Sequence, residues 1–413
     1  MVTDVPKSSP ALQKPGWLKT ILSWLKNYWV RVVIIAIIGI VLGEIVDDTE
    51  LWINYRYHVY QFLQSLPPRK AHPKRTVLVL IGDNEYWSGK DLQARVPLKR
   101  DYLARLVDEA SSANAALIAL DFDLRSPSPE GNPLEYPAYQ KETDALLLAI
   151  QRAAASGRKI VLTKTVGEAS PNLLRTESDI YGREDPGWAN VSTGYHILPD
   201  DVRLLPLALK MNTGRTIDSF CLAIARAEDT PTLSDISDFE TKFYAGFIHP
   251  EKFTRLTADE LLNHDPKTKM LANKVVMISG VWHSLAKNQG QVVNSYETPV
   301  GVLPGVMIHA NYFEALWDAR FYRVWEGWYT RILEFLLALL VAVPFAMKIK
   351  PKTKKLAVIV VPYLLIGVIS YGSLIIFGWF FDPFIPVLSV TAHGILETVL
   401  HWKEVASRVA AVN

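Results

Sequence analysis

Short apolar runs alternate with helical patterns in the first half of a long central region. In chain order, these runs and patterns occupy residues 76–82, 100–110, 116–124, 143–154 and 159–166. The first, third and fifth are short and rich in aliphatic residues, as in buried strands, whereas the second and fourth carry apolar residues along one helix face. Such alternation is typical of a parallel sheet with right-handed crossovers. We therefore predict an α/β domain with a mainly parallel sheet, which gains another strand at 273–281.

Four longer apolar segments flank this region. They occupy residues 24–46, 331–347, 355–376 and 383–402. A helix of about 20 apolar residues crosses a hydrocarbon core of about 30 Å. The sequence therefore predicts an α-helical membrane region of four transmembrane helices, with a large domain of residues 50–328 between the first and the second.

The distribution of basic residues predicts the orientation of these helices. Lysines recur in residues 1–23 and between the second and third segments, whereas the connection between the last two segments has no basic residue. Cytoplasmic loops carry an excess of Lys and Arg. We therefore expect residues 1–23 and 403–413 to be cytoplasmic and residues 50–328 to be extracytoplasmic.

The segment after the last predicted helix predicts how a signal leaves the protein. Residues 403–413 are too few to fold as an output domain. We therefore expect a separate effector protein that acts in trans. Signalling across a single helix ahead of a domain often involves two copies, so a homodimer stays open.

Composition excludes several classes of function. A net charge of +2 leaves no basic excess for a nucleic-acid partner. The single cysteine, Cys221, excludes internal disulfides and cysteine-rich metal sites, and we expect no metal or other cofactor. Hydrophobic residues make up 49% of the chain, and 12 Trp and 17 Tyr suit the interfaces of a lipid membrane.

Polar residues follow the ends of the predicted strands. They are Asp83, Asp121, Asp123, Lys164 and His283. Ligands of open parallel sheets bind beyond the carboxyl ends of the strands, so these residues are candidates to line a ligand-binding cleft. Turn formation and helix capping are the simpler interpretation of each aspartate.

A membrane-tethered hydrolase that uses Asp121, Asp123 and His283 is the alternative interpretation of this set. The chain contains no HExxH, P-loop, GxSxG or GxGxxG motif. We therefore expect no enzyme and assign no catalytic residue. A transporter is disfavoured, because four helices offer few polar residues to line a pore and contain no repeat.

The stretch of residues 296–317 closes the domain. Prolines and glycines at 299–305 predict a tight turn, and the residues after it are apolar on most of a helix circumference. His309 and Asn311 lie in the first turns of that helix. We favour a structural role, in which they hydrogen-bond to the turn, over a ligand contact in the cleft. The helix leads towards the second membrane segment, so its displacement offers a route for signalling.

Several segments, in this order, resemble the CHASE2 domain family, and the resemblance covers about residues 24–402. The matching features are "PLKR" at 97–100, Asp83, Asp121, Asp123 and Asp144, "PDDVRLLPL" at 199–207, "VVMISGV" at 275–281 and "TPVGVLPGVMIHAN" at 298–311. The resemblance implies a sensory module outside the cytoplasm, with one membrane helix before it and three after it. It also implies a small-molecule ligand or other stimulus and a place in the bacterial inner membrane, and it adds Arg100 to the candidate ligand-binding residues.

Ionisable residues also fall inside the predicted membrane helices. They are Glu44, Glu334, His393 and Glu397. For Glu44 and Glu334, near the outer ends of their helices, we favour contact with the headgroups over pairing of Glu44, Arg331 and Glu334 with one another. His393 and Glu397 are four residues apart and therefore share a helix face. Since charged groups avoid lipid, this pair predicts a polar contact between helices or with a partner.

Overall fold

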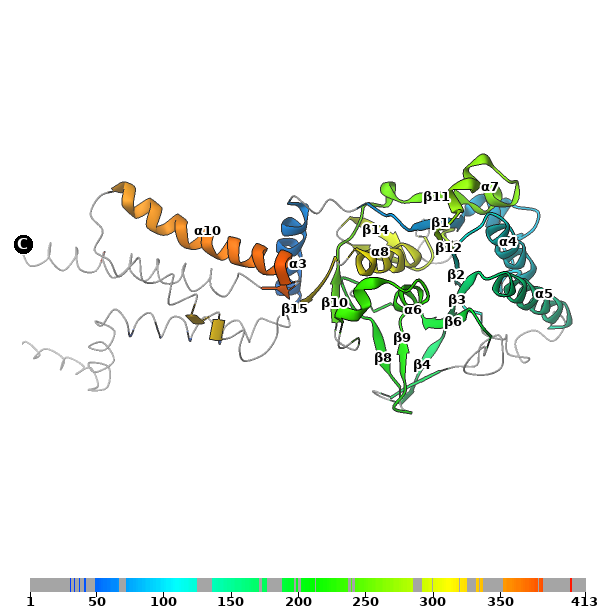
Figure 1. Ribbon diagram of the computed structural model, residues 1–413, viewed down its shortest axis with the longest axis horizontal. Helices are drawn as coiled ribbons and strands as arrows, with labels where there is room; N and C mark the ends of the chain where they lie inside the picture. Colours follow the sequence, from blue (N-terminus) through cyan, green and yellow to red (C-terminus); the bar gives the residue numbers. More distant parts are fainter. Residues whose placement is uncertain are drawn as a thin grey trace, which may run out of the picture. The chain divides into compact units, whose positions relative to one another are not determined.

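The computed structural model (Figure 1) describes the central region and one later segment of the chain. The described residues are 49–66, 72–124, 136–170, 173–176, 188–284 apart from 197, 200–201, 212, 237–238 and 240–241, 292–324 apart from 299 and 319, 352–377 and 379–381, with a few isolated positions elsewhere. The chain divides into two compact units. One comprises residues 57–324, and the other comprises residues 1–56 and 325–413.

A six-stranded sheet lies at the centre of the 57–324 unit, in the order β11-β1-β12-β2-β3-β6. All of its neighbouring strands are parallel. The strands are β1 (Thr76–Ile81), β2 (Leu117–Asp121), β3 (Lys159–Lys164), β6 (Val191–Tyr195), β11 (Thr254–Thr257) and β12 (Val275–Gly280). The predicted α/β domain with a mainly parallel sheet is therefore confirmed, and the four predicted strands all belong to this sheet.

Helices cover both faces of the sheet (Figure 1). One layer contains α4 (Arg100–Ser112), α5 (Tyr136–Ala155) and α7 (Ala258–Leu262), and the other contains α6 (Phe220–Ala227) and α8 (Gly305–Trp317). Successive residues of a strand point to opposite faces. Leu78 of β1 therefore packs in the core with α6 and α8, whereas Val77 and Val79 pack in the core with α4 and α5.

The helix α5 begins earlier than its sequence pattern predicts. It starts at Tyr136, so Asp144 lies in its middle and accepts a hydrogen bond from Gln140 Nε2 at 3.0 Å. The helix predicted from the pattern at 143–154 therefore begins seven residues earlier than expected. Pro137 does not end the helix, because proline is tolerated in the first turn, where its missing N–H has no helical acceptor.

The helix α8 follows a hairpin. Its strands are β13 (Ser295–Thr298) and β14 (Gly301–Pro304), and Gly301 has a φ of 104°, which favours glycine. The predicted turn at 299–305 is therefore wrong in extent, because most of it forms the second strand. Buried residues of α8 run without a break from Val306 to Leu316, as its apolar pattern predicts.

Smaller elements complete the 57–324 unit. One antiparallel sheet contains β15 (Phe321–Val324), β10 (Lys242–Ala245) and β7 (Leu204–Pro206), in this order. Two antiparallel pairs are separate from it. They are β4 (Val166–Ser170) with β5 (Leu173–Thr176), and β8 (Ala208–Lys210) with β9 (Thr216–Asp218). Short helical turns lie at η1 (Asn84–Ser88), η2 (Pro231–Asp235), η3 (Pro250–Lys252) and η4 (Pro266–Leu271). Tyr57 and Tyr60, in the second half of α3 (Glu50–Ser65), contact the ring of Tyr244 in β10.

The other unit contains the first residues of α3, the helix α10 (Lys352–Phe377) and the short strand β16 (Trp379–Phe380). Within the described part of the chain, no helix is long and apolar enough to cross a membrane. The segments 24–46, 331–347 and 383–402 fall almost entirely outside the described residues, as do Glu44, Glu334, His393 and Glu397. The four membrane helices therefore stay a prediction.

Candidate functional site

The carboxyl ends of the parallel strands gather the predicted polar residues along one edge of the sheet. Asp121 ends β2 and Lys164 ends β3, while Asp83 and His283 follow β1 and β12. Because β12 lies between β1 and β2, its end is next to both aspartates. Ser279 of β12 is in register with Asp121. We call this edge the carboxyl edge.

Asp83 and His283 form a pair across β1 and β12. The backbone N–H of His283 donates to Asp83 Oδ1 at 2.7 Å, and His283 Nδ1 lies 2.6 Å from Asp83 Oδ2. These hydrogen bonds hold the pKa of Asp83 below its ordinary value. The side chains are 45% and 47% exposed, so solvent reaches both partners of the pair.

Asp121 lies in a more enclosed environment. Ser279 donates its hydroxyl to Asp121 Oδ2 at 3.0 Å. Burial raises the pKa of Asp121, because the charged carboxylate loses hydration, and the nearby His196 and the Ser279 hydroxyl oppose that rise. The site therefore keeps a carboxyl group that takes up a proton more readily than an exposed aspartate.

His196 is a site residue that sequence reasoning missed. It follows directly after β6, next to Tyr195, and its pKa is lowered by burial, while the nearby Asp121 acts in the opposite direction. Its place depends on Gly194, where an added Cβ would lie 2.8 Å from the Phe220 backbone of α6. A glycine flanking a histidine at the end of a strand is the signal that could have revealed it.

His309 contacts the same region from α8. Its Nε2 lies 3.3 Å from the backbone oxygen of His196, and its ring meets Phe220 edge-on. Burial lowers the pKa of His309 to about 4, so the ring is neutral at pH 7. Within the described residues, the Nδ1 atoms of His196 and His309 have no hydrogen-bond partner.

Lys164 and Asp123 occupy the same edge. Lys164 is buried at the end of β3, in register with Tyr195 of β6. Asp123 follows β2 and accepts a hydrogen bond from Thr165 Oγ1 at 3.2 Å. The carboxyl edge thus combines carboxyl groups, one buried ammonium group and imidazole rings, a set that can bind a polar ligand of either charge.

Arg100 and Asn311 make structural contacts. Arg100 is buried, donates to Thr143 Oγ1 at 2.8 Å and to the Leu124 backbone oxygen at 2.9 Å, and lies over the Tyr139 ring. Asn311 Oδ1 accepts from the Ile248 backbone N–H at 2.5 Å, and its Nδ2 donates to the Met307 backbone oxygen. His309 and Asn311 therefore fasten α8 to segments other than the 299–305 stretch expected from the sequence.

Each of the proposed hydrolase residues has a hydrogen-bond partner outside the trio. His283 pairs with Asp83, Asp121 with Ser279, and Asp123 with Thr165. Among the residues that the structure describes, no group of three or more His, Cys, Asp and Glu side chains is arranged to hold a metal ion. The geometry therefore gives no support to a metal-dependent reaction by this trio.

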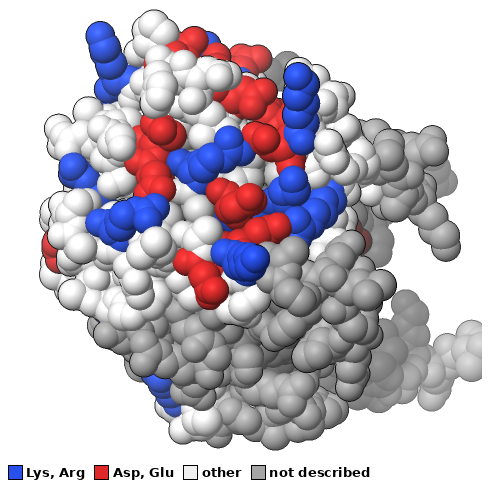
Figure 2. Space-filling view, turned by 90° about the vertical axis from the view of Figure 1, so that its right-hand side faces the viewer, with Lys and Arg blue, Asp and Glu red and all other residues white. Residues whose placement is uncertain are grey.

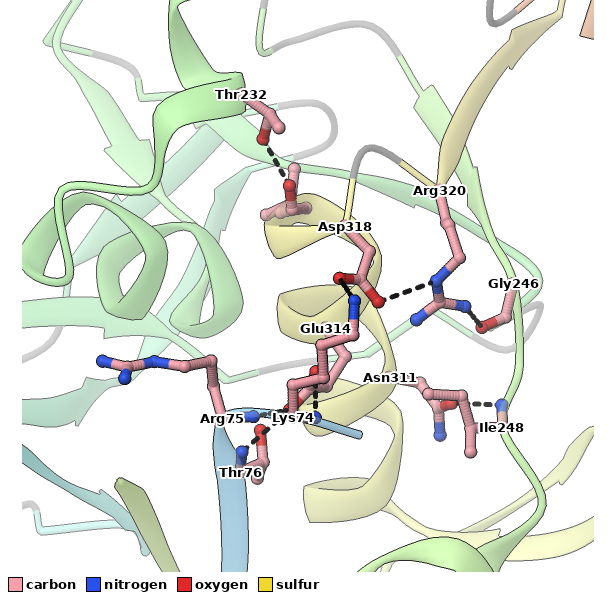
Figure 3. A network of polar contacts seen from close by, with 11 residues as sticks. Lys74, Arg75, Thr76, Thr232, Gly246, Ile248, Asn311, Glu314, Asp318 and Arg320 are labelled. Carbon is pink, nitrogen blue, oxygen red and sulfur yellow. Dashed lines mark hydrogen bonds and ion pairs between the residues drawn. The ribbon is translucent and has the colours of Figure 1, made fainter. Parts of the chain in front are cut away.

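The amino ends of the strands contain a second polar cluster that sequence reasoning missed (Figure 3). Glu314 of α8 is fully buried, and its carboxylate accepts backbone N–H bonds from Lys74, Arg75 and Thr76 at the start of β1. We call this arrangement the Glu314 clamp. A single acidic residue in a largely apolar buried helix is the signal that could have found it, because such a residue requires donors.

Exposed charges elsewhere form mixed pairs. Figure 2 shows acidic and basic residues interleaved over the described part of one face. Exposed pairs include Arg105 of α4 with Asp91 of the preceding loop at 2.5 Å, and Arg152 of α5 with Asp108 of α4 at 2.6 Å. The described part of this face therefore carries no large patch of a single charge sign (Figure 2).

A model of the CHASE2 domain matches residues 32–344 of the chain. No curated protein matches the sequence, and no solved structure matches it. The matched segment covers most of the chain and includes the whole of the 57–324 unit. The chain therefore belongs to the CHASE2 domain family, which is a family of sensory domains.

Proposed function

We propose that this CHASE2 protein is a membrane-anchored sensor, in which a stimulus at the carboxyl edge of an extracytoplasmic domain alters the membrane helices and, through them, a separate effector protein. One observation carries the proposal: a sensory family match over residues 32–344 coincides with a sheet edge that gathers Asp83, Asp121, Lys164 and His283. These residues come from four different strands. A ligand bound among them would contact several elements at once.

The proposed stimulus is a small polar molecule. Asp121 and Lys164 offer opposite charges in an enclosed environment, where electrostatic interactions are stronger than in water. His196 and His309 add ring nitrogens that have no partner within the described residues. A ligand shifts a conformational equilibrium only through differential contacts with the two states, and these four groups are the ones best placed to make such contacts.

The proposed location is the bacterial inner membrane, with four helices at 24–46, 331–347, 355–376 and 383–402. Both termini lie in the cytoplasm in this proposal, and residues 50–328 lie outside it. The lysine-rich connection between the second and third segments supports this orientation. His393 and Glu397 would then face a neighbouring helix, a second copy of the chain or the effector protein.

Crosslinking in native cells tests this function. The full-length chain carries a tag at its C-terminus, complexes are solubilised gently, and co-purifying proteins are identified by mass spectrometry. We expect a kinase, a cyclase or another effector in stoichiometric amount. An Asp121→Asn variant should change the amount recovered, whereas the control Glu251→Gln, on an exposed turn, should not. Recovery of copies of this chain alone, in repeated experiments, contradicts an effector in trans.

A further inference from the structure

Polar side chains of α8 connect this buried helix to several separate segments of the domain. His309 lies within hydrogen-bonding distance of the backbone oxygen of His196, and Asn311 accepts from Ile248. The Tyr312 hydroxyl lies 3.1 Å from the Val202 oxygen and 3.2 Å from the Phe243 oxygen, and Glu314 accepts from residues 74–76. A shift of any of these hydrogen-bonded segments therefore either moves α8 or breaks a hydrogen bond to it. The helix therefore links parts of the domain that are far apart in sequence.

The Glu314 clamp is the densest of these connections (Figure 3). Oε1 accepts the N–H groups of Arg75 at 2.9 Å and Thr76 at 2.8 Å, and Oε2 accepts that of Lys74 at 3.0 Å. Three consecutive amides therefore share one carboxylate that is fully buried. Hydrogen bonds to a charged acceptor in a low-dielectric interior are strong and costly to leave unmade. The start of β1 is accordingly fixed to α8.

Ion pairs extend the clamp to the end of α8. Lys74 Nζ lies 3.0 Å from Asp318 Oδ1, and Arg320 donates to Asp318 Oδ2 and to the Gly246 oxygen, both at 3.3 Å. Arg75 pairs with Glu228 and lies over the ring of Trp317. Lys74 and Arg75 lie directly before β1, and Asp318 and Arg320 lie between α8 and β15. The start of β1 and the connection between α8 and β15 are thus held together at the amino edge of the sheet.

One rigid helix joins this clamp to the carboxyl edge. His309 and Glu314 are five residues apart, which corresponds to about 7.5 Å along the helix axis. Every residue between them is buried. Closely packed helices move as rigid bodies rather than deform gradually. A displacement of the helix at His309 therefore moves Glu314 by a similar amount.

We propose that Glu314 is a coupling residue, through which a displacement of α8 at the carboxyl edge is passed to the start of β1 at the opposite edge of the sheet. The inference rests on the proposed function in one respect, namely that the stimulus acts at the carboxyl edge. It adds the path of the conformational change: α8 is displaced, and the Glu314 clamp passes this displacement to residues 74–76. A purely static role for Glu314 predicts no such link between the two edges.

Hydrogen exchange of the full-length chain, followed by mass spectrometry at single-residue resolution, tests the coupling. The probes are the amides of Lys74, Arg75 and Thr76. His309→Gln perturbs the carboxyl edge, and Glu314→Gln keeps the side-chain volume but removes the charge and one acceptor oxygen. The two substitutions are compared singly and together, which isolates their interaction. Asp121→Asn is a second perturbation of the same edge, in case His309→Gln prevents folding.

Coupling predicts that His309→Gln accelerates exchange of the three amides about tenfold in the wild-type background, within the usual range of coupling between sites. In the Glu314→Gln background, the same substitution should change exchange less than about twofold, because the connection is already broken. Glu228→Gln is the matched control, since it removes the ion pair to Arg75 but leaves the three amide bonds in place. In the Glu228→Gln background, we expect His309→Gln to accelerate exchange of the Lys74, Arg75 and Thr76 amides as much as it does in the wild type.

Two results overturn the coupling. The first is an amide exchange rate at residues 74–76 that changes less than about twofold in both His309→Gln and Asp121→Asn. A change of that size is well below typical coupling between sites. The other is an equal acceleration with and without Glu314→Gln. The measurement uses neither a ligand nor an effector, so its failure leaves the sensor proposal intact. Failure to capture an effector, in turn, leaves the coupling intact.

Discussion

Two buried or partly buried carboxylates lie at opposite edges of the same parallel sheet and are held in different ways. At the amino edge, Glu314 accepts three backbone N–H groups from consecutive residues. At the carboxyl edge, Asp121 accepts the Ser279 hydroxyl, and burial raises its pKa. The buried charge of Glu314 is stabilised by backbone N–H donors. Asp121 keeps a free energy cost that a proton or a bound ligand can relieve.

The amino edge is therefore a fixed attachment, whereas the carboxyl edge is a site that can change. Backbone amides cannot leave Glu314 unless the start of β1 moves, so the Glu314 clamp persists as long as the domain is folded. The carboxyl edge instead combines Asp121 with His196 and His309, whose rings each have a nitrogen without a partner in the described residues. A sensory domain needs both kinds of edge, one that changes and one that passes the change on.

Removal of the Glu314 carboxylate should have the largest effect on stability. Glu314→Ala leaves three N–H groups, that of Thr76 buried and those of Lys74 and Arg75 partly buried, without an acceptor, and we expect it to reduce the free energy of unfolding by about 4 kcal/mol. Urea denaturation of the full-length chain in detergent measures this loss. Glu251→Ala, at an exposed glutamate, is the control and should change stability by less than about 0.5 kcal/mol. A loss below about 1 kcal/mol for Glu314→Ala removes the contrast between the edges.

Acid should destabilise the domain through His309. Its pKa falls from 6.5 to about 4 on folding, so the unfolded chain binds the extra proton between these two values. Stability due to this group is therefore complete above pH 6.5 and is lost as the pH falls towards 4, by up to about 3 kcal/mol. His309→Gln should flatten this part of the pH profile. Parallel profiles for wild type and variant would show that His309 does not contribute.

Asp121 should act in the opposite sense. Its pKa is raised in the folded state, so its contribution is present at low pH and lost as the pH rises above its ordinary value of 3.8. Asp121→Asn removes the charge and should stabilise the protein by about 1 kcal/mol at pH 8 while having no effect at pH 3. Thermal denaturation at both pH values measures the difference. Equal destabilisation at both would place Asp121 with Glu314 rather than opposite it.

The exposed pair of Asp83 and His283 should have the smallest effect. Solvent reaches both side chains, and surface ion pairs contribute little to stability. We expect His283→Gln to change the free energy of unfolding by about 0.5 kcal/mol or less. The same denaturation assay applies, with wild type in high salt as the comparison. A loss of more than about 2 kcal/mol would mean that the carboxyl edge is as firmly held as the amino edge.

Local pattern was sufficient to predict the centre of the fold. Apolar runs such as Thr76–Ile81 and Val275–Gly280 are buried on both faces of the sheet, and the helical patterns at 100–110 and 143–154 fall within α4 and α5. The residues at the strand ends could also be located, because strand direction fixes which edge they share. Pairing of Asp83 with His283 could not be predicted, since it depends on β12 inserting between β1 and β2.

The contacts that distinguish the two edges depend on long-range packing. β6 has the mixed sequence "VSTGY", so neither this strand nor the His196 that follows it gave a periodic signal. Glu314 meets residues 74–76, which lie about 240 positions earlier in the chain, and the sequence of α8 alone does not indicate this contact. The sequence predicts structural roles for Asn311 and His309, but their partners, Ile248 and His196, lie 63 and 113 positions away and are not indicated by local pattern.

Amide exchange in the wild-type chain at pH 7 compares the two edges most directly. The amide of His283 is bonded to the exposed Asp83, whereas the amides of Lys74, Arg75 and Thr76 are bonded to the buried Glu314. We predict that the His283 amide exchanges at least about 100-fold faster, because local opening needs less free energy where solvent already reaches the acceptor. Equal protection of all four amides would contradict the division between an adaptable edge and a fixed one.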